Sequence, residues 1–528
     1  MSSELSEQRD QQERPHLVPK PLRPWTRVRK IGHAVAHHCT KHVGAGIIAS
    51  VAYFDPGNWS VDLQAGSLYG YKLLFVVLLS GLGAVVLQIM SARLGCVTGL
   101  DLATHCRILL KNHPRHPRLV RFFVLYPLYA FAQIAIIATD LAELLGSAIG
   151  LSLLIPSLPL YGAVLITAVD IFLILLIGDP GSKKSPVRLF EASIIAMVMV
   201  VFSCFVVLIV KVQPHWPTVF DGFLPSKALT KPSALYTAIG ILGATVMPHA
   251  LFLGSSLATL DRVSPEEAEL PAPPSRPQRN PARYLKSLFA VRKADNFSSP
   301  LRHGDFQNNS LSFVRAHLIH GVIDVAMSLL GFAVVINSAI LILAGAVFFY
   351  DVDPSMRGTN GPASLFDAYD LIAMRIGKPA AVVFAIALLA SGQSASITAT
   401  LSGQIVSEGF LEFKMSPFLT RFITRTIALL PATLVAAVVG RDGLNAVLVA
   451  SQVVLSLVLP FIVFPLVFLT SSSYIMRVKA EDKSEPDLNF ANGRIMKYLG
   501  YLIFVVVLAA NVYAIISLIV YGDMGLAN

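Results

Sequence analysis

The sequence predicts an all-α integral membrane protein with about eleven membrane-spanning helices, built as two inverted repeats of five spans. Three observations lead to this fold class. Only 14% of the 528 residues are charged and 54% are hydrophobic, whereas soluble domains carry about 25% charged residues. Apolar runs of about 20 residues, long enough to cross a bilayer, recur along the chain. Two of these runs are interrupted by proline at matching places.

The distribution of Lys and Arg sets the expected topology. Reading apolar stretches against helix breakers, we place eleven spans near 44–68, 73–95, 120–149, 159–178, 189–211, 233–258, 313–349, 379–409, 420–440, 444–470 and 494–521. With a cytosolic N-terminus, 34 of the 42 Lys and Arg lie in cytosolic segments or at their flanking span ends. Cytosolic loops carry this excess in membrane proteins, so the net charge of +10 reflects membrane orientation and indicates no nucleic-acid partner. The odd span count places the C-terminus outside the cytosol.

The spans divide the chain into four parts. We expect a cytosolic tail at 1–43, a first repeat at 44–212, a second repeat at 213–470, and a cytosolic loop with span 11 at 471–528. A Pro-, Ser- and charge-rich segment at 260–312 interrupts the second repeat and predicts a disordered cytosolic linker. The tail lacks the short apolar core of a cleavable signal. The four cysteines have no paired spacing, so we expect neither a disulfide framework nor a zinc site.

The first interrupted run is span 1, at Asp55-Pro56-Gly57-Asn58. Pro56 removes an amide donor and Gly57 loosens the backbone, so a helix should not continue through this point, and carbonyls are freed within the membrane. An ionised carboxylate there is costly, which makes Asp55 a functional candidate, and Asn58 adds a neutral oxygen. A proline kink capped by Asp and Asn would produce the same pattern.

The second interrupted run is span 6, at Met247-Pro248-His249. Pro248 frees the carbonyl of Ala244, four residues earlier. Met247 offers a thioether, and sulfur beside oxygen ligands favours Mn, Fe, Co or Cd over Mg and Ca, although plain packing also explains an intramembrane Met. Matching breaks in two halves indicate an inverted-repeat transporter with its site near the membrane midplane.

These residues carry a resemblance to a known family. The segments DPGNW and DLQAGSLYGY, and later GATVMPHALFLGSS, resemble the two signatures of the NRAMP (natural-resistance macrophage) metal transporters. The segments TGLDLATHCR, ATDLAELLGSAIG, ASGQSASITATLSGQIVSEGF and SQVVLSLVLPFIVFPL are similar to that family in the same order, over roughly residues 44 to 475. The variants MPHALFLGSS and LGCVTGLDL look closest to the fungal manganese and iron transporters. The resemblance implies a LeuT-like fold with spans 1 and 6 unwound.

The resemblance also implies a set of metal ligands. The family's Asp and Asn fall on Asp55 and Asn58, its Ala carbonyl and Met on Ala244 and Met247, and its span-10 Gln on Gln452. Ala52 matches a further carbonyl ligand on the inner half of span 1.

A proton route needs titratable groups within the spans. Asp55 can exchange a proton for a metal, and His249 titrates near neutral pH. Asp140 and Glu143 share one face of span 3, where they could relay protons or form a static network with Arg425 of span 9. The resemblance favours a relay, because the family's proton exit uses matching acids in span 3 and an Arg in span 9. The family often has a second histidine where this chain has Gly254.

A histidine pair in the tail, His33 and His37, has a spacing that can hold a metal, although a membrane-surface helix with incidental histidines is the simpler interpretation. No nucleophile is paired with a base and no phosphate-binding glycine loop is found, so an enzyme is not expected.

Taken together, we expect a proton-coupled importer of Mn²⁺ or Fe²⁺, and potentially Co²⁺ or Cd²⁺, that works by alternating access as a monomer in the plasma membrane or an endosomal or vacuolar membrane. Metal and H⁺ are its substrates, and no cofactor is permanently bound. Two alternatives are a sodium-coupled organic-substrate symporter, which Asp55 and Met247 disfavour, and a non-transporting metal sensor, for which no large cytosolic domain is found.

Overall fold

The structure is a computed structural model that describes residues 44–177, 186–262, 302–351, 362–412, 417–480 and 486–521. The structural statements below refer to these residues. The tail with its histidine pair and residues 263–301 of the expected linker lie outside them.

The described chain is almost entirely helical, and the predicted fold class is confirmed. Nine stretches are long and apolar enough to cross a membrane, and one of them, Pro56–Thr98, joins the second half of span 1 to span 2. Span 4 contributes a shorter apolar helix. The spans are α3 (Ala45–Val51) with α4 (Pro56–Tyr69), α5 (Leu74–Thr98), α8 (Tyr126–Leu154), α9 (Leu160–Ile177), α10 (Pro186–Val212), α12 (Pro232–Thr245) with α13 (Pro248–Leu257), α15 (Leu311–Ser328) continuing into α16 (Val335–Ala344), α18 (Lys378–Leu411), α19 (Pro417–Val438), α20 (Gly440–Thr470) and α21 (Arg494–Tyr521).

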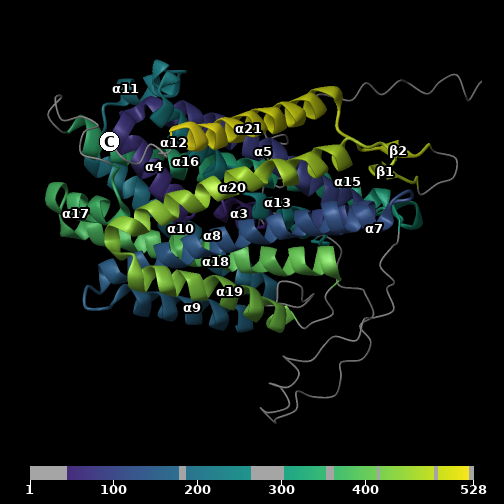
Figure 1. Ribbon diagram of the computed structural model, residues 1–528, viewed down its shortest axis with the longest axis horizontal. Helices are drawn as coiled ribbons and strands as arrows, with labels where there is room; N and C mark the ends of the chain where they lie inside the picture. The colour runs from purple at the N-terminus through teal and green to yellow at the C-terminus, as the bar shows by residue number, and fades with distance from the viewer. Residues whose placement is uncertain are drawn as a thin grey trace, which may run out of the picture. The chain divides into compact units, whose positions relative to one another are not determined.

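Short elements connect the spans at the two ends of the helical bundle. The helices α11 (Trp216–Asp221) and α17 (Leu365–Arg375) lie at one end, and α7 (Pro117–Val120) lies at the other with an antiparallel hairpin of β1 (Arg477–Val478) and β2 (Leu488–Asn489) (Figure 1). The amphipathic helix α6 (Leu102–Lys111) follows α5. The predicted topology places α11 and α17 on one side of the membrane, and α7 and the hairpin on the other side.

Burial separates central spans from peripheral ones. In the most apolar stretch of span 6, 94% of the residues are buried, against 22% in α21. The peripheral helix α19 exposes Leu430, Leu434 and Val438, which are spaced four residues apart and therefore share one face. A continuous exposed apolar face on a helix of this length is suited to lipid. Span 6, by contrast, is enclosed by other helices.

Close glycine contacts hold the two broken spans in place. The backbone N–H of Gly46 donates to Asp324 Oδ2 (2.6 Å), so a buried carboxylate caps the start of α3. A side chain at Gly95 of α5 would overlap the carbonyl of Ser255 in α13. The C-terminal parts of α5 and α13 therefore approach more closely than larger residues would allow.

The last part of the expected linker differs from the prediction of disorder. Within residues 302–310, Asn309 donates its side-chain amide to the carbonyl of Cys96 at the end of α5 (2.9 Å), and Asn308 donates to the carbonyl of Ile475 (2.7 Å). Polar side chains that satisfy buried carbonyls at the ends of helices stabilise an ordered segment there. Composition alone could not indicate these contacts because their partners are distant in the sequence.

Candidate metal-transport site

The site is built at the first helix break, where α3 ends at Val51 and α4 begins at Pro56. Pro56 has no N–H to donate to the carbonyl of Ala52, four residues earlier. Two neighbouring carbonyls of the break are satisfied by other spans. Tyr53 O accepts a hydrogen bond from Asn337 Nδ2 (2.7 Å), and Phe54 O accepts from Ser391 Oγ (2.6 Å). These bonds keep the unwound backbone in a defined shape within the membrane.

Asp55 and Asn58 lie at the start of α4 and are buried, with 0% and 1% of their surface exposed. Asp55 caps the helix, because its Oδ1 accepts the backbone N–H of Asn58 (3.0 Å). Among the described residues, Asp55 Oδ2 and both polar side-chain atoms of Asn58 have no hydrogen-bond partner. Buried polar atoms are normally paired, so these oxygens are available to an additional partner.

The second break repeats the same geometry between α12, which ends at Thr245, and α13, which begins at Pro248. Pro248 cannot donate to the carbonyl of Ala244, four residues earlier, so the two prolines free equivalent carbonyls in the two repeats. Met247 lies between the helices in an extended conformation and is fully buried. Its thioether is therefore within the protein rather than against lipid.

Gln452 of α20 comes between the two breaks. A side chain at Gly57 would overlap the Gln452 amide and lie 3.1 Å from Asp55 Oδ2. A side chain at Gly243, next to Ala244, would overlap the backbone carbonyl of Gln452. Gly57 and Gly243 thus let α20 approach both broken spans. The Oε1 atom of Gln452 has no hydrogen-bond partner among the described residues.

The donor set determines what the site can hold. Asp55, Asn58 and Gln452 each have a buried side-chain oxygen without a partner among the described residues, and Met247 is a buried residue with a thioether. The described residues contain no group of three or more His, Cys, Asp or Glu that could hold a metal. One carboxylate, amide and carbonyl oxygens and a thioether suit a divalent cation of intermediate softness.

His249 follows the second break and is fully buried in the first turn of α13. Its Nδ1 lies 3.4 Å from Thr139 Oγ1 of α8, and its Nε2 has no partner among the described residues. Thr139 and Glu143 are four residues apart on α8 and share a helix face, so the imidazole contacts the face that carries Glu143. One ring nitrogen remains available to donate or accept a proton.

The two acids of α8 have different surroundings. Asp140 forms a buried ion pair with Arg425 of α19, and Ser396 of α18 donates to the same carboxylate (3.0 Å). Glu143 is also fully buried, but neither of its carboxylate oxygens has a partner among the described residues. The spacing of Asp140 and Glu143 is compatible with a proton relay or with a static network that includes Arg425. The structure shows an ion pair with Arg425 at Asp140, while Glu143 has no partner among the described residues.

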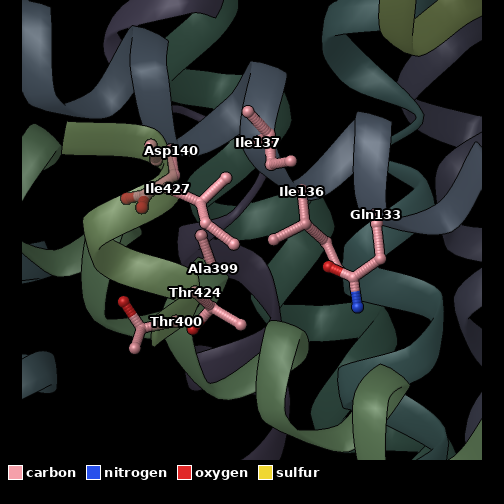
Figure 2. Close-up of a pocket in the computed structure, with 9 residues that line it drawn as sticks. Gln133, Ile136, Ile137, Asp140, Ala399, Thr400, Thr424 and Ile427 are labelled. Atoms are coloured by element: carbon pink, nitrogen blue, oxygen red, sulfur yellow. The ribbon is translucent and has the colours of Figure 1, made fainter. Parts of the chain in front are cut away.

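Asp140 also borders a cavity between α8, α18 and α19. Figure 2 shows the side chains of Asp140 and Gln133 at opposite sides of the view, with Thr400 and Thr424 below them. The cavity volume is about 20 Å³, which is room for about one water molecule. Gln133 Nε2 donates to Ser407 Oγ (3.0 Å) beyond the cavity. Polar groups therefore continue from the ion pair along these three spans.

Several residues that shape the site were not found by sequence reasoning. At Gly254, where the family often has a second histidine, any side chain would overlap the amide of Gln88 from α5. Gln88 is fully buried and its Oε1 accepts a hydrogen bond from the hydroxyl of Tyr53 (3.1 Å). Gln88 and Asn337 are polar residues within apolar spans, and this property could have identified them as candidates.

Two broken helices that enclose unpaired ligand oxygens within a bundle of membrane spans define a membrane transporter of the inverted-repeat class. The match to the natural resistance-associated macrophage protein-like (Nramp) family covers residues 46–517, so the chain belongs to that family. The resemblance noted in the sequence is thereby confirmed, and the chain is a multi-pass membrane transporter rather than an enzyme.

Relatives include fungal proteins and a solved bacterial structure. The manganese transporter pdt1 of Schizosaccharomyces pombe is 41% identical over 87% of this chain and 80% of its own length. The iron transporter SMF3 of Saccharomyces cerevisiae is 36% identical over 92% of this chain and 97% of its own length. The structure of the Eremococcus coleocola manganese transporter superimposes with a TM-score of 0.67 at 30% identity, over 91% of this chain and 87% of that one.

Proposed function

We propose that this protein imports divalent transition metal ions, Mn²⁺ or Fe²⁺, into the cytosol. The observation that carries the proposal is that Asp55, Asn58 and Gln452 each have a buried side-chain oxygen without a partner among the described residues, and that the Gln452 amide lies against the first proline break. Leaving such groups without partners costs free energy, and a bound cation offsets that cost. The names of the fungal and bacterial relatives, which are manganese and iron transporters, support the same cargo.

The choice among divalent ions depends on Met247 in this proposal. Ca²⁺ and Mg²⁺ prefer ligand sets made of oxygen alone, whereas a thioether favours Mn²⁺, Fe²⁺, Co²⁺ and Cd²⁺. Met247 is fully buried at the N-terminal end of α13, so its sulfur is positioned by the backbone of the break. The sodium-coupled organic-substrate alternative receives less support, because a fixed Asp55 carboxylate repels an anionic substrate.

Metal entry is coupled to protons in the proposed mechanism. A dication displaces the proton of Asp55, and the proton passes to His249 and Glu143, two buried groups with side-chain atoms that have no partner among the described residues. The Asp140–Arg425 pair and the cavity beside it then provide a route along α8, α18 and α19. Because protons move with the metal in this mechanism, transport should respond to the pH difference across the membrane.

Alternating access follows from the position of the breaks. The proposed ligands are buried, with at most 2% of their surface exposed, so release requires helices to move. The half-helices α3 and α13 are the elements whose movement would open the site to the cytosol, with the N-terminus on that side and the C-terminus opposite. We expect the monomer to be the transporting unit, in the plasma membrane or an endosomal or vacuolar membrane.

The test is uptake by the purified protein in proteoliposomes loaded with a pH-sensitive dye. Wild type should carry Mn²⁺ and Fe²⁺ inward, exclude Ca²⁺ and Mg²⁺, and acidify the lumen in step with the metal. Asp55→Asn keeps the size of the side chain but removes its charge and its titration, and should abolish both signals. Wild-type protein that moves no Mn²⁺ would refute the proposed cargo, whereas Mn²⁺ uptake without acidification would refute only the coupling.

A further inference from the structure

Span 11 carries one buried polar side chain on an otherwise peripheral helix. The described residues of α21 are mostly exposed, and those that are buried, Gly500, Val507, Asn511 and Ala514, recur at helical spacing along one face. Asn511 is 3% exposed. Figure 1 shows α21 lying alongside α20, the helix that supplies Gln452. A polar residue buried between two spans is costly unless it is paired, so its partner identifies its role.

The partner is Ser456 of α20, and the pairing is reciprocal. Ser456 Oγ donates to Asn511 Oδ1 (2.7 Å), and Asn511 Nδ2 donates to the carbonyl of Ser456 (2.5 Å). Pro460 stands four residues after Ser456 within the same helix and has no N–H for that carbonyl. Asn511 therefore supplies the hydrogen bond that the proline removes from α20.

Ser456 lies one helical turn from Gln452 and against the second broken span. A side chain at Gly243 would sit 2.6 Å from Ser456 Cβ and would overlap the carbonyl of Gln452. One turn of α20 thus contacts α21 on one side and the end of α12 on the other. The Gln452 amide projects from this turn to Gly57 at the first break.

We propose that Asn511 is a positioning residue for the metal site. By replacing the hydrogen bond that Pro460 removes, it fixes the turn of α20 that carries Gln452 and so holds the Gln452 amide beside Asp55. The inference rests on the proposed function, because it assumes that Gln452 is a ligand of the transported metal. The accessory span outside the two repeats thereby tunes the affinity of a site to which it contributes no ligand.

The competing explanation is that Asn511 only attaches α21 to the bundle. The two roles differ in what they change. Loss of an attachment lowers thermal stability and leaves metal affinity unaltered, whereas loss of positioning weakens metal binding through Gln452. A partner that orients a metal ligand typically contributes 10- to 100-fold to metal affinity, and Asn511 acts through one helical turn, so we expect about a 10-fold effect.

The experiment measures the Mn²⁺ dissociation constant and the thermal midpoint of the full-length protein in nanodiscs, with KM for Mn²⁺ in proteoliposomes. Asn511→Ala should raise the dissociation constant and KM about 10-fold. The matched control Val512→Ala removes a neighbouring side chain that is 47% exposed, and should leave both unchanged. Ser456→Ala changes the shape of the side chain little and removes one of the two hydrogen bonds between Ser456 and Asn511. It should therefore weaken Mn²⁺ binding about threefold.

A double-mutant cycle with Gln452→Ala distinguishes the outcomes. If Asn511 acts through Gln452, then Asn511→Ala adds no further loss of affinity in the Gln452→Ala background. Independent, multiplying losses would overturn the proposal, as would an Asn511→Ala variant that loses stability but binds Mn²⁺ within twofold of wild type. If wild type fails to bind Mn²⁺, the proposed function fails and this inference fails with it. If Gln452→Ala weakens binding while Asn511→Ala does not, only the positioning role is refuted.

Discussion

Replacing Gly57 with Ala tests whether Gln452 belongs to the metal site. The new methyl group would overlap the Gln452 amide and lie 3.1 Å from Asp55 Oδ2. The overlap with the amide is too close for a Cβ atom, so the Gln452 side chain must leave its position, whereas the contact with Asp55 needs a shift of only a few tenths of an ångström. Because the replacement adds only one carbon to the first turn of α4, the helix itself should persist.

The magnitude follows from the loss of one ligand. Forcing a side chain about 30° from its preferred rotamer costs about 1 kcal/mol, and a displaced amide no longer reaches the cation. A tenfold change in affinity corresponds to about 1.4 kcal/mol, so we expect the Mn²⁺ dissociation constant to rise about tenfold. In the Gln452→Ala background the methyl group meets no amide, and the same substitution should change the affinity by less than about twofold.

The assay is Mn²⁺ binding by calorimetry in nanodiscs, with thermal unfolding as a check on folding. Gly321→Ala is the matched control, because it makes the same chemical change on α15 with no atom within 4 Å of the new methyl group. Binding by Gly57→Ala within twofold of wild type would show that the Gln452 amide does not participate. A further tenfold loss in the double mutant would show that Gly57→Ala acts elsewhere.

Three further perturbations address other parts of the molecule. Met247→Ala should preserve Mn²⁺ uptake but reduce its preference over Ca²⁺ at least tenfold, because only oxygen ligands remain; unchanged Ca²⁺ exclusion in competition flux assays would contradict this. Arg425→Gln removes the partner of Asp140 and should lower the number of protons carried per metal, and an unaltered ratio of acidification to uptake would exclude Arg425 from the proton route. Burial, with a smaller contribution from His303, lowers the pKa of His105 to about 3 from its usual 6.5. The folded form therefore binds fewer protons than the unfolded form between these values, and the packing of residues 302–310 on α6 should weaken as pH falls below about 6.5. Hydrogen exchange of that segment should accelerate at pH 5.5 in wild type and accelerate less in His105→Asn, because burial also lowers the pKa of His303, which still titrates there.

The breaks could be read from the sequence because their cause is local. Proline affects the carbonyl four residues earlier whatever surrounds it, so Pro248 indicates the freed carbonyl of Ala244 and Pro56 indicates that carbonyls are freed at the first break. Asp55 and Met247 are candidates for a similar reason, since a carboxylate or a thioether beside such a break is unusual wherever the span lies. The spans themselves follow from apolar length alone.

The meeting of these groups with residues from other spans depends on tertiary packing. Gln452 lies almost 400 residues from Gly57 in the chain, and only the close approach of α20 at Gly57 and Gly243 brings its amide to both breaks. Gln88 beside Gly254 and Asn511 beside Ser456 depend on helix contacts of the same kind. The residue types indicate that these polar groups need partners. Which partner each group can reach depends on how closely the helices approach one another, and small residues on distant segments of the chain set that distance.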